Sequence, residues 1–101
     1  MSLALAAPAA AQPAAAGKPD WRGTGTVVAV LRAPSDLHAT RPVIVIRHDP
    51  IAGLMDEAMS MPFIAASTDL FEGLAMGDRI TFGLRETPGA LLVISIGRLP
   101  R

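Results

Sequence analysis

The sequence of 101 residues contains no cysteine and no tyrosine, and only 4% of it is aromatic. Without cysteine, the chain cannot form disulfides, thiolate zinc sites or cysteine nucleophiles. Nine Lys and Arg residues balance nine Asp and Glu residues, so the basic excess typical of nucleic-acid-binding proteins is missing. The scarcity of aromatic side chains also argues against a surface that stacks single-stranded bases.

Long hydrophobic runs are absent as well. No stretch approaches the roughly 20 apolar residues that a membrane-spanning helix needs. Half of the residues are hydrophobic and 18% are charged, which indicates one packed domain rather than a disordered chain. With thiolates excluded, five methionines and two histidines are the side chains best suited to a soft metal ion.

The first sixteen residues, MSLALAAPAAAQPAAA, carry no charge and are rich in alanine. Small-residue patterns at 9–11 and 14–16 indicate the remnant of a secretory signal, although the basic segment and long apolar core of a complete signal are missing. A flexible tail of the mature protein is the alternative. Pro8 and Pro13 interrupt any helix, so we expect residues 1–19 to be disordered and residues 20–101 to form the domain.

The domain contains short segments with the composition or alternation of strands and no long helix. Ser67–Phe71 is expected to form a single helical turn with Ser67 or Thr68 as its N-cap, and Pro88-Gly89 suits a type II turn. Five strands at this length predict an all-β fold, a small OB-type barrel in Greek-key order, with an SH3-like barrel as the alternative. The expected strands are Thr24–Arg32, Pro42–His48, Met59–Ile64, Arg79–Arg85 and Ala90–Arg98.

The candidate functional residues lie between His48 and Phe63. Because side chains alternate along a strand, Met59 and Met61 point to one side with Phe63 next along it, while His48 continues an inward-facing row of isoleucines. If these two strands are neighbours, one imidazole and two thioethers meet at the mouth of the barrel. Such neutral donors suit Cu(I) and Ag(I), and binding should weaken below about pH 6, where imidazole protonates.

Each of these residues also has an ordinary structural explanation. Methionine packs adaptably, so a pair spaced two residues apart is often core filler. A histidine at the end of a strand is often bonded to backbone or solvent. Elsewhere, we expect His38 to lie on the surface in the loop 33–41, Met76 to pack over the helical turn, and Arg79 to lie on the solvated face.

Residues Gly23–Ile96 resemble the CusF-like family of periplasmic copper- and silver-binding proteins. Three motifs carry the resemblance: H-D-P-I at 48–51, A-M-S-M-P-F at 58–63 and G-D-R-I-T-F at 77–82. The resemblance implies a five-stranded OB-type barrel in which a histidine and two methionines, 11 and 13 residues later, bind Cu(I) or Ag(I). In this sequence these offsets select His48, Met59 and Met61.

One position departs from the family pattern. Members associated with efflux place a tryptophan eight residues after the histidine, where its ring covers the metal by a cation–π contact. This chain has Asp56 there, and its only tryptophan, Trp21, precedes the first expected strand. The Asp56 carboxylate should leave the ion more exposed and favour harder ions such as Cu(II). We therefore expect Asp56 and Phe63 to flank or cap the ligands.

The segment from Gly53 to Phe63, G-L-M-D-E-A-M-S-M-P-F, looks like a subgroup found beside copper-delivery proteins of the SCO type. We hypothesise that Met55 swings over the site as a third thioether. The alternative is that Met55 covers the barrel mouth as an apolar lid.

The sequence thus predicts a monomeric, periplasmic, metallochaperone-like domain that binds Cu(I) or Ag(I) and is not an enzyme. Its expected partner is a copper efflux adaptor or an SCO-type copper-delivery protein, with no nucleic acid and no membrane span. The alternative is an OB-type protein-interaction module whose metal site is weak or absent.

Overall fold

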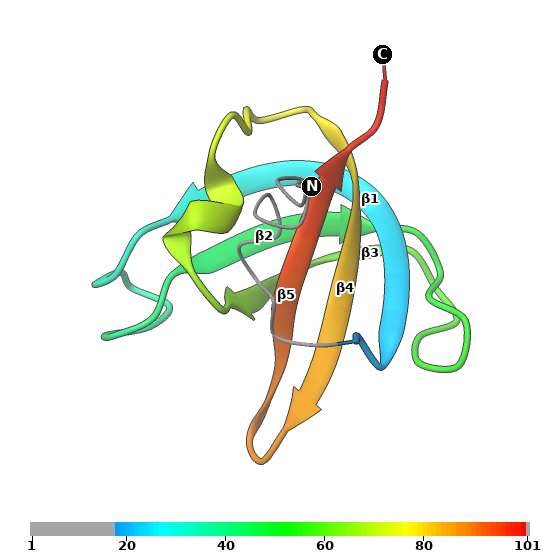
Figure 1. Ribbon diagram of the computed structural model, residues 1–101, viewed down its shortest axis with the longest axis horizontal. Helices are drawn as coiled ribbons and strands as arrows, with labels where there is room; N and C mark the ends of the chain where they lie inside the picture. The colour runs from blue at the N-terminus through cyan, green and yellow to red at the C-terminus, as the bar shows by residue number, and fades with distance from the viewer. Residues whose placement is uncertain (1–17, 101) are drawn as a thin grey trace, which may run out of the picture.

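The strands of the computed structural model, which describes residues 18–100, close into one barrel in the order β1-β2-β3-β5-β4 (Figure 1). Every neighbouring pair is antiparallel except β3 and β5, which run parallel. This arrangement confirms the predicted all-β barrel. Its elements are β1 (Trp21–Leu31), β2 (Val43–His48), β3 (Met59–Ala65), the 3-10 turn η2 (Thr68–Phe71), β4 (Arg79–Thr87) and β5 (Ala90–Arg98).

The barrel interior is filled by the apolar side chains that alternate along the strands. In β4, for example, exposed Arg79 and Thr81 alternate with buried Ile80 and Phe82. Burial of each large aliphatic or aromatic side chain contributes about 1.5–3 kcal/mol, so this alternation holds the barrel closed. The largest fully buried apolar side chains are Ile44, Ile46, Ile51, Ile80, Leu84 and Ile94.

Both local turn predictions are supported by the backbone. The Ser67 hydroxyl accepts a hydrogen bond from the Asp69 N–H at 3.0 Å and so caps η2. Gly89 has a φ of +118° in the two-residue connection between Thr87 and Ala90. A side chain at that position would be strained, which explains the glycine.

The first strand begins three residues earlier than the sequence indicated. Residues Trp21–Gly23 have little strand character of their own, but they pair with β4, with Trp21 opposite Leu84. Trp21 is therefore part of β1 and packs against the core. The expected disorder of residues 1–19 falls almost entirely on residues 1–17, which lie outside the described part of the chain.

The expected packing of Met76 over η2 is wrong, because its side chain is 76% exposed. The turn that contains it is held to β1 instead: the Gly77 N–H donates to the Val27 carbonyl at 2.8 Å. The Asp78 carboxylate accepts the Ala75 N–H at 2.9 Å and stabilises the same turn. Within residues 18–100, no helix is long and apolar enough to cross a membrane.

The register of β2 between its two neighbours determines what lies at its end. His48 is opposite Gly25 of β1 and Met59 of β3. A Cβ atom on Gly25 would lie 2.6 Å from the Arg47 carbonyl oxygen and 2.9 Å from the His48 Cα. The absence of a side chain at Gly25 thus allows β1 to pass closely across the end of β2.

Gly25→Ala should consequently destabilise the protein by about 1–3 kcal/mol, the usual cost of overpacking a tight interior. Guanidinium denaturation measures this cost. The matched control is Gly97→Ala, whose added Cβ meets only the Thr81 hydroxyl at 3.2 Å. Equal losses in the two variants would contradict the close approach of β1 to His48.

Candidate metal centre

His48 ends β2 with its side chain fully buried in the barrel. Its Nδ1 lies 2.9 Å from the carbonyl oxygen of Asp49, and because a carbonyl only accepts, Nδ1 must carry the hydrogen. In the neutral ring, Nε2 then has a free lone pair. Within residues 18–100, Nε2 is the one buried side-chain nitrogen or oxygen atom with no hydrogen-bond partner. Leaving such an atom unpaired costs about 1–3 kcal/mol of folding free energy. A buried lone pair without a partner is therefore a candidate for binding a ligand.

The two methionines of β3 lie on the same face as this imidazole. Met59 is directly opposite His48 and Met61 is opposite Ile46, and residues opposite one another in an antiparallel pair share a face. Met59 is 47% exposed at the rim, whereas Met61 is half-buried and packs against the core. The pairing that the sequence required between these strands is therefore present.

Phe63 continues the methionine face into the interior, where it is buried. Its ring centroid is 6.0 Å from that of His48 in an edge arrangement, and 5.8 Å from that of Phe82. The Phe63 ring is thus one of the groups that shield the fully buried imidazole from solvent. Phe63 therefore contacts the predicted ligand His48, and its role beside a bound ion stays a prediction.

The loop between β2 and β3 is a tight turn anchored in the core. The Ile51 N–H donates to the Met55 carbonyl at 2.7 Å, and the Met55 N–H donates to the Ile51 carbonyl at 2.9 Å. The Ile51 side chain is fully buried. Met55 is half-buried and packs against the core, whereas Asp56 is exposed. This packing suits an apolar lid, and the role of Met55 as a third thioether stays a prediction.

Sequence reasoning missed the aromatic side chain that contacts this loop. A Cβ atom on Gly53 would lie 3.6 Å from Nε1 of Trp21, so the indole lies beside this part of the loop. Trp21 and Gly53 are far apart in the chain, and the antiparallel pairing of β1 with β2, continued by the bond from the Asp49 N–H to the Thr24 carbonyl, brings the start of β1 beside this loop. A glycine in the loop was the available signal, but its partner could not be identified from the sequence.

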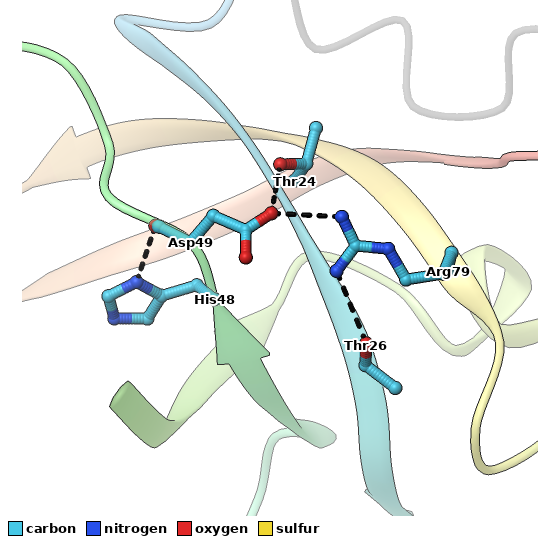
Figure 2. A network of polar contacts seen from close by, with 5 residues as sticks. All are labelled: Thr24, Thr26, His48, Asp49 and Arg79. Carbon is cyan, nitrogen blue, oxygen red and sulfur yellow. Dashed lines mark hydrogen bonds and ion pairs between the residues drawn. The ribbon is translucent and has the colours of Figure 1, made fainter. Parts of the chain in front are cut away.

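A polar network on the outer side of the barrel was also missed (Figure 2). The Asp49 carboxylate accepts the Thr24 hydroxyl at 2.6 Å and the Arg79 guanidinium at 2.9 Å, and that guanidinium also donates to the Thr26 hydroxyl at 3.3 Å. The hydrogen bond from Thr24, and next the one from Arg79, hold the pKa of Asp49 below its usual value. Arg79 is solvated as expected, but it is also tied to the residue after His48.

The remaining histidine belongs to a different part of the fold. His38 Nδ1 accepts the N–H groups of Thr40 and Arg41 at 3.2 and 3.0 Å, which orders the loop before β2. That loop and the Met55 loop emerge at opposite ends of β2 (Figure 1). Among the described residues, no three His, Cys, Asp or Glu side chains form a group that could hold a metal ion. The imidazole of His48 and the thioethers of Met59 and Met61, which lie on one face of β2 and β3, stay the predicted metal donors.

Replacing Asp49 with Asn should lower the stability of the fold in a pH-dependent way. A depressed pKa stabilises the folded state above the ordinary value of 3.8, and this contribution is lost as the pH falls through the lowered pKa. Both partners are nearly half exposed, so at pH 7 the loss should stay below about 1 kcal/mol. Urea titrations from pH 7 to 2 should show the difference between variant and parent closing, and a constant difference would contradict the assignment.

Comparisons with known proteins identify similar chains with the same barrel fold. A family model for the copper binding periplasmic protein CusF matches residues 21–98. Apo-CusF from Escherichia coli is 25% identical, with 83% of this chain and 93% of that chain covered and a TM-score of 0.61. No curated protein sequence matches the chain.

Two further structures of CusF contain metal ions. The Ag(I) complex is 25% identical, with 77% of this chain and 95% of that chain covered and a TM-score of 0.55. A variant from Escherichia coli with one tryptophan replaced by alanine, in complex with Cu(II), is 25% identical, with 79% and 91% covered and a TM-score of 0.56. The family match spans the whole barrel from β1 to β5, and the chain therefore belongs to the CusF family of copper-binding periplasmic proteins.

Proposed function

We propose that this chain binds Cu(I) or Ag(I) through Nε2 of His48 and the thioethers of Met59 and Met61. The observation that carries the proposal is the buried Nε2 atom without a partner, on the barrel face that also holds both methionines. Neutral nitrogen and sulfur donors are ligands that soft monovalent ions prefer. Membership of a metal-binding family also supports the expectation that the chain is not an enzyme.

The same arrangement suits an ion that must be released. Three neutral donors hold a monovalent ion without the tight grip of thiolates. Met59 is 47% exposed, so an incoming ligand from a partner protein can reach the ion beside it and displace it stepwise. We therefore assign the chain a metallochaperone-like role, in which the ion passes to its partner by ligand exchange at the barrel mouth.

Two residues of the loop tune this proposed site. Met55 supplies a third thioether if its half-buried side chain moves outward from the core by rotation. Asp56 occupies the position where efflux-associated relatives have a capping tryptophan, and its exposed carboxylate leaves the ion open to water. A CusF variant that lacks a tryptophan has been solved with Cu(II), which supports the idea that this chain also accepts Cu(II).

The proposed location is the periplasm, in keeping with the family, and the proposed state is a monomer. The partner is a copper efflux adaptor or an SCO-type copper-delivery protein. The competing function is an OB-type protein-interaction module whose metal site is weak or absent.

Titration with Ag(I) tests the ligand set directly. The ε-methyl NMR signals of Met59 and Met61 should shift at one equivalent, and Met59→Leu or Met61→Leu should weaken binding by at least about tenfold because each removes a donor. Met76→Leu is the matched control, since Met76 is 76% exposed in a turn tied to β1. Unmoved signals at one equivalent would favour the interaction module.

Trp21 provides a separate test for Met55. Because the indole lies beside the loop at Gly53, an outward movement of Met55 on Ag(I) binding should change the Trp21 emission. In a Met55→Leu variant, that change should be lost and the affinity for Ag(I) should fall. An unchanged affinity in this variant would reduce Met55 to an apolar lid.

A further inference from the structure

Asp49 is held at three points by residues of β1 and β4. Its N–H donates to the Thr24 carbonyl at 2.9 Å, and its carboxylate accepts from the Thr24 hydroxyl at 2.6 Å. The Arg79 guanidinium donates to the same carboxylate oxygen at 2.9 Å (Figure 2). Thr24 thus holds the backbone and the side chain of one residue together, and Arg79 adds a charge-assisted bond from β4.

The carbonyl of this same residue accepts the hydrogen bond from Nδ1 of His48 at 2.9 Å. The position of that carbonyl therefore decides which ring nitrogen carries the hydrogen. A hydrogen on Nε2 would point into a buried environment without an acceptor, whereas a hydrogen on Nδ1 is satisfied by Asp49. Fixing Asp49 in this way keeps the Nε2 lone pair free.

We propose that Thr24, Asp49 and Arg79 form a clamp that positions His48 for metal binding by holding it in its Nδ1–H tautomer. The tautomer itself is a property of the metal-free protein. Its consequence for affinity rests on the proposed function, since the free Nε2 is the nitrogen that would bind Cu(I) or Ag(I). Outer partners that orient a metal-binding histidine commonly affect affinity by about 10- to 100-fold.

The clamp lies on the outside of the barrel, so its effect on the orientation of His48 can be distinguished from an effect on the stability of the fold. The Asp49 and Arg79 side chains are 44% and 46% exposed on the outside of the barrel, while His48 is buried inside. Half-exposed ion pairs contribute little to the free energy of unfolding. Loss of the clamp should therefore alter the imidazole more than the stability of the fold.

The first experiment observes the metal-free protein. Long-range ¹H–¹⁵N spectra at neutral pH should show His48 as the Nδ1–H tautomer in the parent protein. In the double variant Thr24→Val/Arg79→Ala, which removes both bonds to the carboxylate, the Nε2–H tautomer should become populated. The matched control is Thr40→Val/Arg85→Ala, which makes the same kinds of change at positions whose hydrogen bonds involve neither Asp49 nor Arg79.

The second experiment measures the affinity for Ag(I) in the same proteins. The clamp variant should bind Ag(I) about tenfold more weakly than the parent, and the control variant should bind like the parent. Asp49→Ala provides a further variant and should reproduce the effect. Denaturation midpoints measured alongside show whether each variant has kept its fold.

The outcomes separate the clamp from the proposed function. An Nε2–H tautomer in the parent, or an unchanged tautomer and affinity in the clamp variant, would overturn the clamp even if the parent binds Ag(I) tightly. A parent that shows the predicted tautomer and its loss in the variant, but binds no Ag(I), would support the clamp and overturn the metal-binding function.

Discussion

The register of β2 between β1 and β3 is the constraint on which the site depends. It places His48 opposite Gly25 on one side and Met59 on the other. Because strand side chains alternate with period two, a slip of one residue would turn the imidazole to the outside and separate it from the thioether face. The fit against Gly25, where no side chain could be accommodated, helps to exclude such a slip.

The same register places two consecutive residues, His48 and Asp49, on opposite faces of the barrel. His48 points inward, where Phe63 shields it from water, and Asp49 follows it onto the outer surface, where Thr24 and Arg79 bind its carboxylate. Interior burial makes Nε2 a strong candidate donor, and the exterior bonds orient the ring. Neither face alone would leave Nε2 both shielded from solvent and fixed in direction.

The parts of this arrangement that could be predicted from the sequence follow from local periodicity. Alternation placed Met59 and Met61 on one side of a strand, and the isoleucine row of β2 indicated that His48 faces inward. The contacts of Trp21, Thr24 and Arg79 could not be predicted, because they depend on which distant strands become neighbours. The register of β1 with β4 joins residues more than fifty positions apart, and no local pattern encodes it.

X-ray absorption at the copper edge of the Cu(I)-loaded protein tests the central claim most directly, because it identifies the atoms bound to the ion. The account predicts methionine sulfur atoms together with one imidazole nitrogen, and loss of the nitrogen in a His48→Phe variant. A first shell of oxygen and nitrogen without sulfur would contradict it.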